Sequence, residues 1–374
     1  MGRQACLDTA ERTLKILYSF WGFVTPFEKN STAATPDHYR GGRVDLIDEM
    51  IRRGHTPIQL QDRRDNEPYK GIKYVEDWES LPDGDVLFVE WRWPTWKNSR
   101  ALGGSKATEP DYDRQCQLLD YYSKIGTRVI IHDGDLKMTP SDEMRWPNAI
   151  LADACISPRV QTRPRISMPW CSAARRLFPT VDYSYNYTYV GNNYDRDPQF
   201  RKYYGQPAVG LRQLGVQTTV WGNWLERSLE RRDPANLVKD FPFVAFGPRL
   251  SYKDIFRTIN SSVAVTHITR DDYTPYGNIT MRFTEAIQAG VVGLVPVEYK
   301  HALPVGLDGE WVVSSQSDVV DRVRRLSMLP AEDRSKIVDN QEIALRSIVD
   351  FSPSHKVDII EGVARGELGQ RNTG

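Results

Sequence analysis

The sequence predicts an α/β protein in which buried strands, polar loops and helices alternate. The clearest unit lies at 262–297. An apolar, β-branched run at 262–266 predicts a strand, the polar loop RDDYTPYGN follows, and a helix begins near Thr280 and ends at Gly290. The run at 291–297 predicts the next strand. Because the chain has 374 residues and single cores rarely grow beyond about 250–300, we expect two such domains.

Charge and cysteine content narrow the class of function. Lys and Arg number 49, as do Asp and Glu, so there is no overall basic field and a polyanion must meet a local patch. The cysteines lack metal-ligand spacing, which predicts reduced thiols in a cytoplasmic protein: Cys6, Cys116, Cys155 and Cys171. No segment has the ~20 apolar residues that span a bilayer, so no membrane partner is expected.

Two acids stand out in the first half of the chain. Apolar runs there predict strands at 14–20, 55–60, 85–91 and 127–132, with helices at about 43–53 and 112–125. Asp133 and Asp135 follow the last strand, at the carboxyl end where open α/β sheets bind ligands. Facing a gap between domains, such a carboxylate suits an inverting group transfer, because it can take the proton from an attacking hydroxyl. The alternative is a DGD turn, with Asp133 as a cap and Gly134 at positive φ.

Two further segments have features of a nucleic-acid surface. The loop after 85–91 carries Trp93 and Trp96 among cationic residues, which suits stacking on bases. The stretch between Asp153 and Asp182 has no acid and contains arginines that suit phosphate contacts: Arg159, Arg163, Arg165, Arg175 and Arg176. Alternatively, tryptophans of this loop fill the core and the arginines belong to a solvated linker.

The second half repeats the strand–loop–helix pattern. Strands are predicted at 185–190, 216–221 and 243–246, and helices at 198–214, 251–259, 317–329, 331–349 and about 354–366. Gly191 ends the first of these strands and permits a close backbone approach, while Arg196 and Arg201 lie near the following helix, where a phosphate is favoured.

The helix that begins near Thr280 has the features of a nucleotide site. Its N-terminus favours an anion, and Arg282 in the first turn suits bidentate phosphate binding. Glu285, one turn later, suits the hydroxyls of a ribose. The alternative is an ordinary surface ion pair between Arg282 and Glu285.

Several segments together carry a family resemblance. In the second half they are YTYVGNNYDRDPQFRKYY, TTVWGN, AFGPRLSYKDI, DDYTPYGNITMRFTEAIQAGVVGLVPVEY and SDVVDRVRRLS; in the first half they are LKILYSF, RVIIHDGDLK and RWPN. In order and spacing these resemble the T-even phage DNA β-glucosyltransferases, which are glycosyltransferases of the GT-B class. The resemblance implies two Rossmann-like domains that face a cleft.

The resemblance also implies residue roles. Arg282 would hold the donor diphosphate and Glu285 the ribose hydroxyls. Asp135 matches the general base when no gap is introduced, and Asp133 is the alternative. The other implied donor-site residues are Gly191, Arg196, Arg201, Leu250 and Tyr273.

Three features depart from the family pattern. Arg196 and Arg201 are spaced one residue wider than the family's phosphate arginines. Arg270 stands where an acid is expected, and the family's acid at the first helix falls near Arg43. The departures at Arg270 and near Arg43 concern the identity of the sugar and the geometry of the acceptor.

The resemblance implies transfer of glucose, or a related hexose, from UDP-glucose or a similar UDP-sugar to the hydroxymethyl group of a 5-hydroxymethylpyrimidine in double-stranded DNA. The base would be flipped out of the duplex. A requirement for Mg²⁺ or Mn²⁺ stays open, no metal ligand is assigned, and a cytoplasmic monomer is expected. The predicted domains are 1–180 for the acceptor and 181–345 for the donor, with a C-terminal helix in 346–374 packing back on the first. The alternatives are a GT-B enzyme for a small molecule or surface polysaccharide, and a non-catalytic nucleotide- or DNA-binding module.

Overall fold

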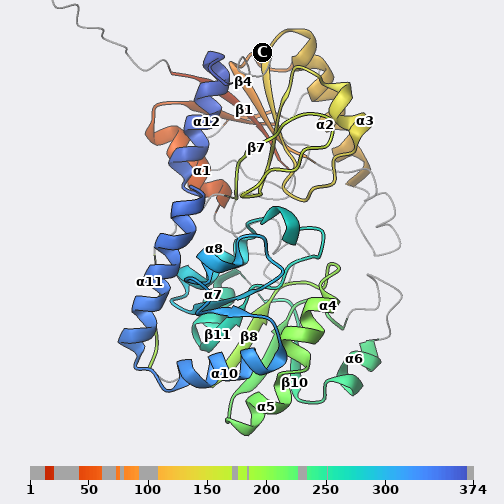
Figure 1. Cartoon of the computed structure of the whole chain (residues 1–374). Coiled ribbons are helices and arrows are strands. Elements are labelled where there is room, and N and C mark those ends of the chain that lie inside the picture. Colours follow the sequence, from red (N-terminus) through yellow and green to blue (C-terminus); the bar gives the residue numbers. More distant parts are fainter. Residues whose placement is uncertain are drawn as a thin grey trace, which may run out of the picture.

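The computed structural model describes residues 13–20, 42–60, 73–75, 80–91, 108–170, 176–182, 185–225, 234–250 and 252–368. Figure 1 shows two α/β domains, one above the other, with α11 and α12 along one side. The predicted fold class of two Rossmann-like domains is confirmed.

The first domain is built on a seven-stranded sheet in the order β3-β2-β1-β4-β5-β6-β7, with parallel neighbours throughout. Helices cover both faces, so its central strands consist almost entirely of buried residues. The strands are β1 (Lys15–Ser19), β2 (Thr56–Leu60), β3 (Lys73–Val75), β4 (Val86–Glu90), β5 (Arg128–His132), β6 (Ile150–Asp153) and β7 (Ile166–Ser167), and the helices are α1 (Gly42–Arg52), α2 (Thr108–Lys124) and α3 (Pro140–Arg145).

The second domain has a six-stranded parallel sheet in the order β10-β9-β8-β11-β12-β13. Its strands are β8 (Asn186–Val190), β9 (Gln217–Trp221), β10 (Val244–Gly247), β11 (Ser262–Thr266), β12 (Val292–Pro296) and β13 (Val312–Val313). Its helices are α4 (Asp197–Phe200), α5 (Ala208–Gln213), α6 (Pro234–Asp240), α7 (Tyr252–Asn260), α8 (Met281–Gln288), α9 (Ala302–Val305), α10 (Gln316–Ser327) and α11 (Ala331–Ile348).

Chain order reverses at the same place in both sheets. β1 lies beside β4 in the first, and β8 lies beside β11 in the second. Ligands of such sheets bind at the carboxyl ends of the strands at this switch point. A ligand site is therefore expected near the carboxyl ends of β1 and β4 in the first sheet and of β8 and β11 in the second. β5 is the next strand beside β4.

The helix predicted at 198–214 is interrupted in the structure. α4 passes into a π-helical turn, η3 (Arg201–Gly205), and α5 begins only at Ala208. The turn is packed inward, because Tyr203 and Tyr204 are fully buried. The π-turn thus begins at the predicted phosphate arginine Arg201.

The last helix, α12 (Pro353–Arg365), packs on the first domain. Val357, Ile360 and Val363 share one buried cluster with residues of β1 and α1. Arg53 also forms ion pairs with Asp358 (2.6 Å) and Glu361 (3.3 Å) of α12. α11 packs instead against β12 and α8 of the second domain, so the chain crosses between domains just before α12. None of the described helices is both long and apolar enough to cross a membrane.

Candidate active site

The loops after β5 and β11 meet at the domain boundary. The Tyr273 hydroxyl donates a hydrogen bond to Asp135 Oδ1 (2.9 Å), and Asn278 Nδ2 donates to the Gly134 carbonyl (3.2 Å). The structure thus brings together Asp135, which the sequence assigns to the reaction, and Tyr273, which it assigns to the donor. The two residues are far apart in the chain and come from different domains.

A short backbone ladder joins the segment after β6 to the loop after β11. The Ile156 amide donates to the Gly277 carbonyl (3.0 Å), and the Ile279 amide donates to the Ala154 carbonyl (2.8 Å). Cys155 and Asn278 form the antiparallel bridge between them. Main-chain hydrogen bonds therefore fix the acceptor-side loop against the segment that leads into α8.

Asp135 has the environment of a base. Its side chain is partly exposed, and burial together with the nearby negative charge of Asp133 raises its pKa, although the hydrogen bond from Tyr273 lowers it. Burial raises the pKa of Tyr273 well above its ordinary value, so its hydroxyl stays protonated and keeps donating to Asp135.

Asp133 has a structural environment instead. It is 1% exposed, and its carboxylate accepts hydrogen bonds from the amides of Lys137 (2.7 Å) and Met138 (2.9 Å). It also forms ion pairs with Arg165 (3.0 Å) and Arg159 (3.2 Å). A buried carboxylate with four donors has no room for a substrate hydroxyl, so the alternative assignment of Asp133 as the base is not supported.

The DGD segment is indeed a turn capped by Asp133, but not in the expected form. Leu136, rather than Gly134, adopts the left-handed conformation (φ 54°). Gly134 is required for a different reason, because a Cβ there would collide with the indole ring of Trp170.

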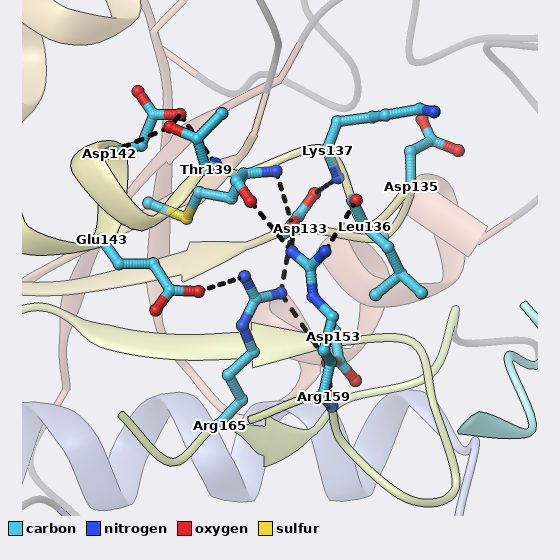
Figure 2. A network of polar contacts seen from close by, with 12 residues as sticks. Asp133, Asp135, Leu136, Lys137, Thr139, Asp142, Glu143, Asp153, Arg159 and Arg165 are labelled. Carbon is cyan, nitrogen blue, oxygen red and sulfur yellow. Dashed lines mark hydrogen bonds and ion pairs between the residues drawn. The ribbon is translucent and has the colours of Figure 1, made fainter. Parts of the chain in front are cut away.

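Three arginines predicted to contact DNA are engaged inside the first domain, and Figure 2 shows Arg159 and Arg165 among them. The Arg165 side chain is fully buried between Asp133 and Glu143 (2.6 Å). Arg159 binds Asp133 and the carbonyls of Leu136 (3.1 Å) and Met138 (3.0 Å). Arg163 donates to the carbonyls of Trp146 (2.8 Å) and Pro147. These guanidiniums hold loops of the first domain in place, and this arrangement does not support a DNA contact for them.

The remaining DNA-contact predictions fall elsewhere. Arg176 forms an ion pair with Asp339 on α11 (2.6 Å) and a hydrogen bond with Ser335. Trp93, Trp96 and Arg175 lie outside the described residues. Trp91, at the start of the aromatic loop, is buried edge-on against Trp146 and Tyr112, as the core-filling alternative predicts.

In the second domain, the ends of β8 and β9 approach each other closely. The Gly191 amide donates to the Trp221 carbonyl (2.8 Å), and Gly222 has φ 145°, where a Cβ would strike the Gly191 carbonyl. The main-chain N–H of the next residue, Asn223, donates a hydrogen bond to Asn192 Oδ1 (3.1 Å). Gly191, which was predicted to permit a close backbone approach, therefore lies where the ends of β8 and β9 are in close contact.

The two predicted phosphate arginines of the β8 loop do not lie together. Arg196 donates to the Asn192 carbonyl (2.8 Å), and its charge acts on Tyr273. Arg201 instead forms ion pairs with Asp197 (2.8 Å) and with Asp240 on α6 (3.3 Å). Residues five positions apart differ by about 140° around an α-helix, so the wider spacing turns Arg201 to another side. Its assignment to the phosphate group is not supported by this arrangement.

α8 presents its N-terminus with polar groups around it. The hydroxyl oxygen of the N-cap residue Thr280 is buried without a hydrogen bond. Arg282 pairs with Glu285, as the ion-pair alternative predicts, but the pair is buried: the side chains are 10% and 0% exposed. A buried arginine beside free helix N–H groups and an unpaired hydroxyl forms a set of donors suited to an anion. Leu250, after β10, packs against the apolar cluster that contains Val190 at the end of β8.

Two further cations lie at the domain boundary. The Arg270 guanidinium lies 4.8 Å from the centre of the Tyr273 ring and pairs with Asp272 (2.5 Å). Burial and the positive charge of Arg270 lower the pKa of Lys137. Sequence reasoning singled out Arg270 only as a departure and missed Lys137, although Lys137 stands two residues after Asp135. Within the described ranges no group of three or more His, Cys, Asp or Glu residues is arranged to hold a metal ion, so we assign no metal ligand.

Comparisons with known proteins identify the fold. No protein-family model matches the sequence. No curated protein matches it either. Among solved structures, T4 phage β-glucosyltransferase with UDP-glucose superposes with a TM-score of 0.62 and 13% identity, covering 94% of this chain and 99% of that chain.

Other solved structures of the same kind are similar. An α-glucosyltransferase in complex with UDP and a 13-mer DNA containing a HMU base has a TM-score of 0.55 and 12% identity, covering 95% of this chain and all of the other. T4 phage β-glucosyltransferase with UDP and Mn²⁺ has a TM-score of 0.61 and 12% identity, covering 94% and 99% of the two chains. The chain therefore has the two-domain fold of these glucosyltransferases over nearly its whole length.

Proposed function

We propose that this protein is an inverting hexosyltransferase that moves glucose, or a related hexose, from a UDP-sugar to the hydroxymethyl group of a 5-hydroxymethylpyrimidine in DNA. One observation carries the proposal. A partly exposed carboxylate at the end of β5, Asp135, is hydrogen-bonded to Tyr273 (2.9 Å), a few residues before the anion-suited N-terminus of α8. A base and a phosphate site thus come from opposite domains, as transfer between two substrates requires.

Asp135 is the proposed general base. It takes the proton of the acceptor hydroxyl while that oxygen forms a bond to the anomeric carbon of the sugar. The bond from this carbon to the diphosphate breaks on the opposite face, and both bonding electrons leave with UDP. Because no covalent sugar–enzyme intermediate forms, a single carboxylate suffices in this scheme. Tyr273 orients that carboxylate through its hydrogen bond.

The donor is assigned to the second domain. The N–H groups of the first turn of α8, the Thr280 hydroxyl and Arg282 would receive the negative charge that develops on the leaving diphosphate. Arg196 adds a further positive charge near Tyr273. Glu285 is paired with Arg282, so a ribose diol would exchange part of this pair for hydrogen bonds of its own. We take the protein to act as a cytoplasmic monomer.

The experiment is a transfer assay with radiolabelled UDP-glucose and duplex DNA. One DNA carries hydroxymethylated cytosine, a second carries hydroxymethylated uracil, and a third is unmodified. Label should appear in hydroxymethylated DNA and not in the unmodified duplex. Hydrolysis of UDP-glucose without label in any DNA would refute the acceptor assignment while leaving donor use intact.

One observation favours a second candidate, an enzyme of the same chemistry that acts on a small hydroxylated molecule. Arg159, Arg163 and Arg165, the core of the predicted DNA patch, are engaged inside the domain, and the chain has no net charge. DNA binding predicts a log–log salt slope of about −0.9 for each phosphate contact. A slope near zero with hydroxymethylated DNA would favour the small-molecule acceptor.

A further inference from the structure

The segment that carries Asp135 is a tight turn whose conformation must be held from outside. Leu136 has φ 54°, which an L residue with a branched side chain rarely adopts unless neighbouring contacts impose it. The Asp133 carboxylate ties the start of this segment to its end, through the amides of Lys137 and Met138. Asp135 lies between these anchors, so the position of its carboxylate depends on them.

Arg159 holds the same segment, 133–138, through further hydrogen bonds (Figure 2). Its Nη1 donates to the Leu136 carbonyl (3.1 Å), and its Nη2 donates to the Met138 carbonyl (3.0 Å) and to Asp133 (3.2 Å). One planar guanidinium thus joins the residue before the turn to two carbonyls after Asp135. Lysine cannot reproduce this fork, because its ammonium is a single point of charge.

The position of Arg159 is itself fixed. Its main-chain amide donates to the buried Asp153 carboxylate (2.9 Å). Farther along the loop, Arg165 is locked between Asp133 and Glu143, and Glu143 accepts from the Thr162 amide (3.0 Å). The guanidinium of Arg159 is therefore carried by a loop that is anchored on both sides.

The same geometry argues against a phosphate contact for Arg159. The Arg159 side chain is 18% exposed, its two terminal nitrogens are both engaged, and Nε is buried without a partner. An external phosphate would have to displace bonds that hold the turn. Arg163, four residues later, offers a comparison, because its guanidinium binds the carbonyls of Trp146 and Pro147 and makes no hydrogen bond to 133–138.

We infer that Arg159 is a positioning residue for the reaction: it clamps the turn 133–138 and so sets where the carboxylate of Asp135 meets the acceptor. The inference rests on the proposed role of Asp135 as the base. Arg159 is therefore expected to affect turnover rather than DNA affinity. Arg159 touches neither substrate in this assignment.

The test compares Arg159→Gln with Arg163→Gln, which removes the same charge from the same loop. With hydroxymethylated DNA and UDP-glucose, Arg159→Gln should lower kcat by about 10- to 100-fold, because a misplacement of about 1 Å costs this much. Its UDP affinity and the salt slope of DNA binding should match the wild type. Arg163→Gln should change kcat less than about twofold, and Arg159→Lys should recover only part of the loss.

A second measurement does not depend on activity. Hydrogen–deuterium exchange of the peptide that contains 133–138 should accelerate in Arg159→Gln and stay at the wild-type rate in Arg163→Gln, with similar melting temperatures. If the wild type transfers no sugar, the proposed function fails, but this exchange result still decides whether the clamp exists. Unchanged exchange and kcat in Arg159→Gln, with a salt slope smaller by about 0.9, would instead make Arg159 a phosphate contact.

Discussion

Asp133 and Asp135 stand two residues apart but have opposite environments. Asp133 is saturated by two amides and two arginines, whereas Asp135 has one described hydrogen bond, from Tyr273, and a raised pKa. At the residue scale this difference separates a residue that supports the loop from one that can accept a proton.

Asp135→Asn keeps the size of the side chain and removes its basicity. We expect turnover to fall by about 10²–10⁴-fold, the usual contribution of general-base catalysis, while UDP affinity stays near the wild type. Transfer kinetics and calorimetry with UDP measure the two quantities. Asp133→Asn is the matched control: breaking its buried ion pairs should lower the free energy of unfolding by about 3–5 kcal/mol, measured in urea. Loss of transfer in a stable Asp133→Asn protein with an active Asp135→Asn protein would reverse the assignment.

The pH dependence should follow the state of Asp135. Burial raises its pKa, so the acid limb of the kcat/KM profile should lie above the ordinary aspartate range, since the base works only when deprotonated. A raised carboxyl pKa also means that this group costs folding stability as pH rises through that pKa. The hydrogen bond from Tyr273 acts in the opposite direction and lowers the pKa.

Tyr273→Phe removes that hydrogen bond while keeping the ring. The pKa of Asp135 should then rise further, and the acid limb of the kcat/KM profile should move to higher pH. The measurement is kcat/KM across the acidic range for the wild type and the variant. An acid limb that stays in place, or moves to lower pH, would contradict the assignment of that limb to Asp135.

At the scale of elements, α8 and the loop after β8 contribute unequally to the proposed donor site. α8 brings its free N–H groups, Thr280 and Arg282 to one place, whereas the π-turn η3 begins at Arg201, which pairs with α6. π-Turns within helices often mark functional sites, and here the turn begins at Arg201, directly after α4.

Arg282→Ala should weaken UDP binding by about 10- to 150-fold, the equivalent of about 1.5–3 kcal/mol for a charge-assisted hydrogen bond to a partly buried ligand. Arg201→Ala removes the same charge from a partly exposed pair with Asp197 and Asp240 and should change UDP affinity less than about threefold, within ~0.6 kcal/mol. Titration calorimetry with UDP compares both variants. Equal losses of UDP affinity in the two variants would instead support a phosphate contact for Arg201.

Glu285→Ala tests the partner of Arg282 in the same assay. Its carboxylate is fully buried beside Arg282, so its removal loses the proposed ribose contact and also releases the guanidinium. We expect UDP affinity to fall by about 10-fold or more. If UDP affinity is unchanged in both Arg282→Ala and Glu285→Ala, the proposed donor site at α8 is wrong.

At the scale of the whole molecule, the last described helix, α12, completes the core of the first domain. α12 fills the first-domain core through Ile360 and Val357, both fully buried, after the chain has built the second domain. The two domains are therefore joined by two crossings and by the ladder between 154–157 and 276–279. The ladder keeps the segment after β6 in contact with the loop after β11.

Ile360→Ala should lower the free energy of unfolding by about 2–5 kcal/mol, because it leaves a cavity in the first-domain core. Ile343→Ala, on an exposed position of α11, is the control and should change it by less than about 0.5 kcal/mol. Urea denaturation followed by circular dichroism compares them. Similar small effects in both variants would show that α12 is dispensable to the first domain.

The sequence alone determined the alternation of strands and helices, the two-domain α/β fold and the location of Asp135 at a strand end. These follow from hydrophobic periodicity, which is local: apolar runs mark the buried strands, and polar loops follow them. The short strands β3, β6 and β7 were not predicted, whereas β10, which has only four residues, was predicted at 243–246.

The tertiary structure alone decided which partners each charged residue has. Arg159, Arg163 and Arg165 look like a phosphate patch in the chain, but their partners include Asp133 and Glu143, which lie 22 to 32 positions away. Tyr273 reaches Asp135 across 138 positions. An ion pair depends on which side chains the fold brings within about 4 Å, and residue order does not encode that distance. Burial by the fold also decided that Asp133 is held while Asp135 remains available.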